Sequence, residues 1–145
     1  MRKVLFVLGV LLSLGLFCGC SNSDDTTDSV LYNQWVLVSY GNESNEVLKE
    51  ANGYYYMITF HRDGTYSGIA YGNKMEGTYK CILDSFKFID GIITQLYVEG
   101  ADPDRFFLKH LYDIYTYKIT DTELRLYYSE DQYFKFRISN APYYI

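Results

Sequence analysis

The feature that most constrains the fold is the alternation of apolar and polar side chains near the C-terminus. In "YTYKI", "ELRLYY" and "YFKFRI" the apolar side chains fall at every second position. Successive side chains of a β-strand point to opposite faces, so this period of two predicts half-buried antiparallel strands. The seventeen tyrosines, nine phenylalanines and only two prolines of the chain also favour strands.

Glycine-containing turns separate the earlier apolar runs. Asp63-Gly64 and Asp90-Gly91 are typical of two-residue hairpin loops. Gly68 and Gly77 lie inside strand-like runs, where glycine marks a bulge or a close approach of two backbones. Such positions occur where a sheet curls. The sequence therefore predicts a mainly β fold, a strongly curved antiparallel sheet or barrel of about 7–9 strands.

One segment, "ADPDRFFLKHLYD", departs from the period of two. Asp102 is a candidate N-cap, and Pro103 suits the first position of a helix. Phe107 and Leu111 are four residues apart, which gives an apolar stripe at helical spacing. We therefore expect one helix near residues 103–112, packed on the sheet in an α+β arrangement.

The N-terminal residues have the composition of a bacterial lipoprotein signal. Arg2 and Lys3 precede a largely apolar run over residues 4–17, which is too short to cross a hydrocarbon core of ~30 Å. Gly19-Cys20 resembles a lipobox, so we expect cleavage after residue 19 and lipidation of Cys20. The alternative is an ordinary cleaved signal that leaves a soluble protein. The predicted organisation is a signal peptide over 1–19, a lipidated flexible tether over 20–30 and a single domain over 31–145.

The tether sequence bears on the location of the domain. Residues 21–29 contain only polar side chains, so they cannot bury apolar surface. Asp24 and Asp25 resemble the acidic export signal that follows the lipidated cysteine of Bacteroides-type surface lipoproteins. Their alternative role is to keep the linker solvated. We expect a lipid-anchored outer-membrane protein, with exposure at the cell surface as the hypothesis that the acidic pair suggests.

The sequence offers no residues with an evident catalytic or metal-binding role. The nucleophile-elbow, phosphate-loop and zinc-binding motifs are absent from it. His61 and Asp63 would supply only two metal ligands, which is too few for a structural zinc site. The net charge of −5 becomes −7 once Arg2 and Lys3 are removed, which argues against nucleic acid as a partner. We therefore expect no enzyme activity, no cofactor and no metal.

Consecutive tyrosines are the better candidate for a binding surface. A strand must present tyrosine on both faces where Tyr54, Tyr55 and Tyr56 follow one another, and again at Tyr127 and Tyr128. Tyrosine combines an apolar ring with a polar tip and is enriched at binding surfaces. The alternative is that these rings fill the core.

The order of short motifs resembles the META, or HslJ-like, family of bacterial lipoproteins and secreted domains. The resemblance covers roughly residues 35–138. It begins with "WVLVSY" and "ITFHRDGTYSG", and its later matching residues are Gly68, Asn73, Gly77, Tyr79, Thr94, Phe107, Leu111, Tyr117, Ile119, Leu124 and Leu126. This resemblance implies a non-enzymatic cell-envelope lipoprotein that binds envelope components or takes part in stress tolerance.

A rival resemblance is to the lipocalin-like lipoproteins of Bacteroides type. That family shares the early tryptophan, the "F-x-x-D-G-T-Y" hairpin and the later "G-T-Y" strand. It implies a carrier that holds a small apolar ligand inside its barrel. The expected partners are thus the membrane, through the lipid on Cys20, and either an envelope protein or a small apolar ligand.

Overall fold

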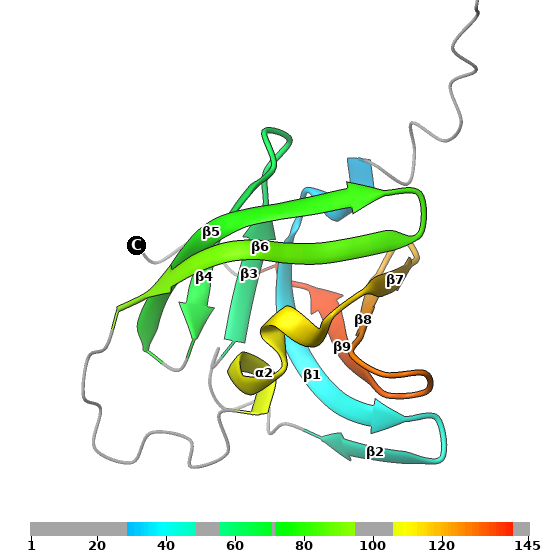
Figure 1. Ribbon diagram of the computed structural model, residues 1–145. Helices are drawn as coiled ribbons and strands as arrows, with labels where there is room; N and C mark the ends of the chain where they lie inside the picture. Colours follow the sequence, from blue (N-terminus) through cyan, green and yellow to red (C-terminus); the bar gives the residue numbers. More distant parts are fainter. Residues whose placement is uncertain (1–28, 49–55, 71, 95–105, 141–145) are drawn as a thin grey trace, which may run out of the picture.

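The computed structural model describes residues 29–48, 56–70, 72–94 and 106–140, and its main elements are strands (Figure 1). They are β1 (Gln34–Asn42), β2 (Asn45–Leu48), β3 (Tyr56–Phe60), β4 (Thr65–Ala70), β5 (Asn73–Ile82), β6 (Ser85–Ile93), β7 (Thr116–Ile119), β8 (Glu123–Tyr127) and β9 (Tyr133–Ile138). Every pair of neighbouring strands is antiparallel.

The sheet closes on itself. Its strand order is β2-β1-β3-β4-β5-β6-β7-β8-β9, and β1 also pairs with β9. β1 shares its other edge between β3, which pairs with residues 34–36, and β2, which pairs with residues 39–42. The result is an up-and-down barrel to which β2 is added as a hairpin arm. The predicted curved antiparallel sheet or barrel is confirmed.

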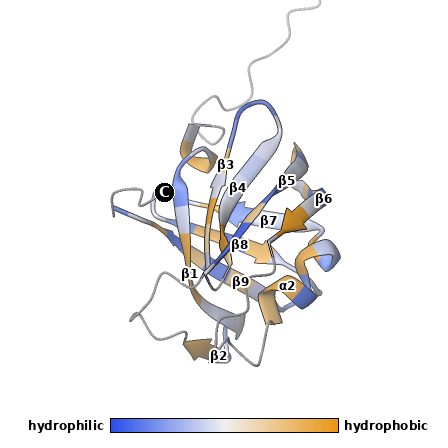
Figure 2. Ribbon diagram, turned by 90° about the vertical axis from the view of Figure 1, so that its left-hand side faces the viewer, coloured by the Kyte–Doolittle hydropathy of each residue, from blue (hydrophilic) through white to orange (hydrophobic). Residues whose placement is uncertain are grey.

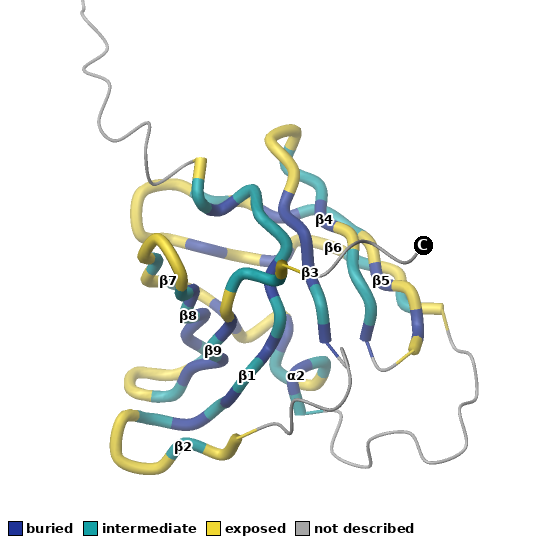
Figure 3. Tube along the Cα trace, turned by 180° about the vertical axis from the view of Figure 1, so that it is seen from behind, coloured by how far each residue is buried: buried dark blue, intermediate teal, exposed yellow. Residues whose placement is uncertain are grey.

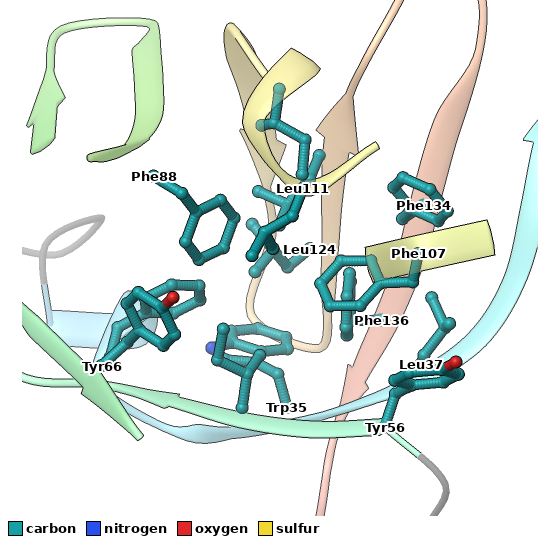
Figure 4. Close-up of a cluster of buried hydrophobic side chains, with 14 of the residues drawn as sticks. Trp35, Leu37, Tyr56, Tyr66, Phe88, Phe107, Leu111, Leu124, Phe134 and Phe136 are labelled. Carbon is teal, nitrogen blue, oxygen red and sulfur yellow. The ribbon is translucent and has the colours of Figure 1, made fainter. Parts of the chain in front are cut away.

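Aromatic side chains fill the interior of the barrel (Figure 4). Trp35, Phe86, Phe134 and Phe136 are 0% exposed, and many of the interior rings meet edge to face. The Trp35 indole nitrogen donates a hydrogen bond of 2.9 Å to the Leu31 carbonyl oxygen, so the polar atom of this buried side chain has a partner. The alternation of the C-terminal sequence is confirmed, because Phe134 and Phe136 face inward while Arg137 is exposed.

Residues 106–113, which lead into β7, form short helical turns over one end of the barrel. The α-helix α2 spans Phe106–Lys109, and the 3-10 helix η1 spans Leu111–Asp113. Phe107 and Leu111 are both 2% exposed, so their predicted packing against the sheet is confirmed. The described α-helix ends earlier than expected, because the chain tightens after His110 into a 3-10 turn. Asp102 and Pro103 lie outside the described residues.

The turns are only partly as predicted. Asp63-Gly64 does form the β3–β4 turn, which is strongly hydrophilic (Figure 2). Asp90-Gly91 does not form a turn but lies inside β6, so that prediction is wrong. The glycine is needed there because a Cβ at Gly91 would come within 2.2 Å of the Tyr66 hydroxyl oxygen. The β5–β6 hairpin turns instead at Leu83, which has a positive φ of 55°.

The two predicted strand glycines are close approaches. A Cβ at Gly68 would lie 2.0 Å from the Met57 carbonyl oxygen, and one at Gly77 would lie 2.1 Å from the Asp90 carbonyl oxygen. Both contacts are with backbone, so a side chain could not be accommodated by a rotamer change. β5 also carries an irregularity of register beside Gly77, between Thr78 and Tyr79. These positions let the wall curl, as the sequence indicated.

Candidate functional site

The predicted site residues do not gather on one surface of the described structure. Cys20, Asp24, Asp25, Tyr54 and Tyr55 lie outside the described residues. The structure therefore bears only on the other three tyrosines of the predicted aromatic surface.

Those three tyrosines occupy different environments. Tyr56 is 3% exposed inside the barrel, with its ring 5.5 Å from that of Phe107, so it is a core residue. Tyr127 is 8% exposed and lies against Tyr133 on the outer wall, with Lys118 over its ring. Tyr128 is half-buried beneath α2. Of the two alternatives, packing accounts for these three rings.

An aromatic cluster closes the barrel end that α2 covers. The Phe106 ring lies 4.7 Å from Tyr40 and 4.6 Å from His110, and His110 stacks on Tyr128 at 4.9 Å. Burial raises the pKa of the Tyr128 hydroxyl. The His110 Nδ1 atom lies 2.8 Å from an Asp113 carboxylate oxygen, which fixes the orientation of the imidazole. These contacts hold α2 against the barrel as a plug.

A polar cluster on the outer wall joins β2 to β9. Both carboxylate oxygens of Glu46 accept hydrogen bonds from the Lys135 ammonium, at 2.5 and 2.6 Å. Tyr133 donates a further hydrogen bond of 2.7 Å to Glu46, and the fully buried Ser39 hydroxyl donates one of 3.2 Å. Hydrogen bonds from Lys135 and then Tyr133 lower the pKa of Glu46. Burial, followed by the bond to Glu46, raises the pKa of Tyr133 to about 12. Because each member of the cluster has a hydrogen-bond partner within it, the role of the cluster is structural: it holds β2 to β9.

A hollow on the outer wall of β4, β5 and β6 is a better candidate for a binding site. It has a volume of about 620 Å³ and is open to solvent. Its walls come from outward-facing residues of neighbouring strands, since Ser67 pairs with Glu76, and Glu76 pairs with Ile92. Its lining residues are His61, Thr65, Tyr66, Ser67, Glu76, Gly77, Thr78, Asp90, Gly91 and Ile92. We refer to it as the β4–β6 hollow.

The polar groups of this hollow are partly committed to one another. The His61 Nε2 atom lies 3.0 Å from the Ser67 hydroxyl. One Asp90 oxygen accepts hydrogen bonds from both the amide and the hydroxyl of Thr78, at 2.8 and 2.9 Å. The Glu76 side chain is exposed, and its carboxylate has no hydrogen-bond partner among the described residues. The hollow therefore offers a carboxylate acceptor beside an exposed Ile92 side chain.

Within the described ranges, no carboxylate joins the Ser67–His61 pair to complete a catalytic triad. Asp63, the nearest carboxylate in sequence, accepts hydrogen bonds from the amide and hydroxyl of Thr65, and the Thr65 hydroxyl bond lowers its pKa most. The described parts of the chain also hold no group of three or more His, Cys, Asp or Glu residues arranged to bind a metal ion.

Sequence reasoning missed this hollow because it depends on strand register. Ser67, Glu76 and Asp90 are far apart in the sequence, and only the pairing of β4, β5 and β6 brings them together. The available signal was alternation: Thr65 and Ser67 occupy the outward positions of a strand whose inward position is Tyr66. That pattern shows which side chains of β4 face outward. It does not show which residues of β5 and β6 lie beside them.

Comparisons with known proteins place the chain by its fold. No family model matches it, and no curated protein matches it. In the described residues, the structure contains no helix with the length and apolar character needed to cross a bilayer.

Solved structures share the architecture. A DUF4847 family protein from Bacteroides vulgatus is 15% identical, with a TM-score of 0.59 over 79% of this chain and 98% of that chain. A protein from Burkholderia xenovorans is 16% identical, with a TM-score of 0.59 over 79% of this chain and 87% of that chain. At these identities the similarity extends to the fold alone.

Proposed function

We propose that this chain is a non-enzymatic, lipid-anchored protein of the bacterial cell envelope, of META-like type, which binds its partner with the outside of the barrel. The observation that carries the proposal is the filled interior. Phe107 from the α2 plug is 2% exposed and packs against Tyr56, Phe134 and Phe136 at ring separations of 5.0–5.6 Å. A barrel occupied by its own side chains leaves the outer wall for recognition.

The β4–β6 hollow is the part of the outer wall that best suits this role. Ligand sites combine concave apolar surface with a few polar groups that fix orientation. Here Ile92 supplies apolar surface, and the exposed Glu76 carboxylate supplies an acceptor without a partner among the described residues. A partner that presents a hydroxyl or ammonium group complements this arrangement.

The binding role is tested by recovering the partner from native envelope. We expect the lipoprotein to co-purify with one defined envelope component, and Glu76→Lys to abolish its recovery because the acceptor becomes a cation. Glu130→Lys is the matched control, since Glu130 is exposed in the turn after β8, away from the hollow. Equal recovery with both variants would remove the hollow from the proposal.

The anchor is tested separately. Cys20→Ser should block lipidation and leave the precursor unprocessed, which mass spectrometry of the membrane fraction would show. If the variant matures to the same mass as the unchanged protein and stays membrane-bound, the proposed lipid anchor is wrong.

Surface exposure needs its own test. Replacing Asp24 and Asp25 with Ala should protect the domain from protease added to intact cells. Equal digestion would leave the acidic pair only a solvating role.

A second candidate function is a lipocalin-like carrier. The up-and-down strand order favours it, because such barrels include carriers of small apolar ligands. A carrier would have to displace the α2 plug to admit a ligand. The single tryptophan, Trp35, is fully buried in the barrel and reports on its interior. We expect its emission to stay unchanged when fatty acids are titrated. Saturable quenching at stoichiometric ligand would favour the carrier.

A further inference from the structure

The β5–β6 hairpin ends in an exposed apolar tip, which we define as residues 80–87. Leu83 is 84% exposed and Ile82 is 55% exposed. In Figure 3 this tip is one of the exposed loops that project from the barrel. Leu83 also has a positive φ of 55°, a conformation that two-residue hairpin loops usually assign to glycine, asparagine or aspartate. Neither burial nor turn geometry accounts for a leucine at this position.

The charges at the tip also lower the stability of the hairpin. Lys80 and Lys87 are both exposed and are directly paired across the two strands. Like charges opposite one another destabilise a strand pair. Asp84 is the acidic residue of the tip, and its backbone carbonyl is bonded to the Thr116 hydroxyl. The tip therefore combines two large exposed aliphatic side chains with a net positive charge.

The tip lies at the barrel end where the described chain begins. β1 starts at Gln34 at this end, and because all neighbouring strands are antiparallel, β5 ends there at Ile82. Figures 1 and 3 show the start of the described chain and the hairpin tip toward the same side of the molecule. Arg62, in the exposed turn between β3 and β4, adds a cation at this end.

The tether limits how far this end can lie from a membrane. Ser29 lies nine residue steps after Cys20, and a fully extended chain of that length reaches about 30 Å at most. An anchor on Cys20 thus keeps the barrel end that carries Leu83 near the lipid headgroups. Apolar residues flanked by lysine are the combination that binds anionic bilayer surfaces.

We propose that the tip of the β5–β6 hairpin inserts into an anionic phospholipid surface, with Ile82 and Leu83 entering the headgroup region and Lys80 and Lys87 contacting lipid phosphates. This inference rests on the proposed lipid anchor. The contact orients the barrel, and the end closed by α2 and the β2 arm then points away from the membrane.

Tryptophan reporters in the mature, lipidated protein test the contact. The protein is reconstituted into liposomes of phosphatidylethanolamine and phosphatidylglycerol that contain brominated lipid. Leu83→Trp places the reporter at the tip, and Ile82→Trp is the second reporter in case the turn does not tolerate the first. Leu48→Trp is the matched control, because Leu48 is 76% exposed on β2 at the other end. The unchanged protein supplies the emission of the buried Trp35.

We expect a blue shift and strong quenching for the tip reporters, and neither for Leu48→Trp. Replacing Lys80 and Lys87 with Gln should reduce the quenching, as should liposomes made of phosphatidylcholine alone. Quenching of the tip no greater than at Leu48 overturns the proposal. Quenching that is insensitive to both changes overturns the assignment to anionic lipid.

Flotation of the liposomes separates the two levels of inference. If the lipoprotein floats with the liposomes and its tip is not quenched, the tip contact is wrong and the anchor stands. If the protein does not float, the anchor fails and the tip contact fails with it.

Discussion

The β2 arm pairs with β1 and is also held to the barrel by side chains, of which Glu46 is the central one. Its carboxylate has three hydrogen-bond donors, and its side chain is 20% exposed. Glu46→Gln leaves Lys135 half-buried without its counter-charge. We expect a loss of about 1–3 kcal/mol in the free energy of unfolding at neutral pH. Urea denaturation of the two proteins measures it, and Glu130→Gln, at an exposed turn position, should be neutral.

The Glu46 interaction also predicts a pH dependence. The pKa of Glu46 is lowered in the folded state from its ordinary value of 4.5. Its stabilising contribution is therefore fully present above pH 4.5 and is lost as the pH falls through the lower folded value. The stability difference between the unchanged protein and Glu46→Gln should shrink in acid, because protonated Glu46 resembles glutamine. A difference that stays constant down to strongly acidic pH would contradict this assignment.

Residue identity alone predicts some local structure and misleads elsewhere. Asp63-Gly64 and Asp90-Gly91 are the same dipeptide, yet only the first forms a turn. The second lies inside β6. Because Gly91 has no Cβ, the Tyr66 hydroxyl fits beside it and donates a hydrogen bond of 3.1 Å to the Asp90 carbonyl oxygen. A contact between strands decides the difference, so a local signal could not reveal it.

At the scale of elements, α2 acts as a plug whose stability contribution is concentrated in Phe107. Truncating a buried phenylalanine to alanine costs about 3–5 kcal/mol, against a total of about 5–15 kcal/mol for a domain. Phe107→Ala should therefore lower the denaturation midpoint clearly. Lys109→Ala, on the exposed side of the same helix, should leave it unchanged. Equal midpoints for the two variants would mean that α2 is a lid and would favour the carrier function.

Secondary-structure elements could be predicted from the sequence where their apolar side chains recur at a regular spacing. The C-terminal strands and the buried positions Phe107 and Leu111 follow from spacings of two and four. The β2 arm did not follow, because Val47 and Leu48 are exposed and the arm is held by Glu46 on its outer side. The β4–β6 hollow also requires the register of three strands, and periodicity within one strand does not contain that register.

At the scale of the whole molecule, the closed barrel has one weak seam. β6 and β7 are joined by a single register pair, Ser85 with Thr116, whereas β1 and β9 share six. η1 lies beside this seam, because it packs against β6 shortly before the chain enters β7. Any opening of the barrel to a ligand, or any first step of unfolding, is therefore expected to begin between β6 and β7.

Hydrogen exchange tests the seam directly. The Phe86 amide donates to the Tyr115 carbonyl at 3.1 Å, and the Tyr117 amide donates to the Asp84 carbonyl at 3.4 Å, so these amides close the seam. They should exchange with solvent sooner than the amides of β9, which is paired on both sides with β1 and β8. Leu111→Ala should speed exchange at the seam more than in β9, because Leu111 is buried on η1, which packs against β6 beside the opening. Uniform protection around the ring would instead mean that the barrel opens only by global unfolding, which would leave a carrier no route to its interior.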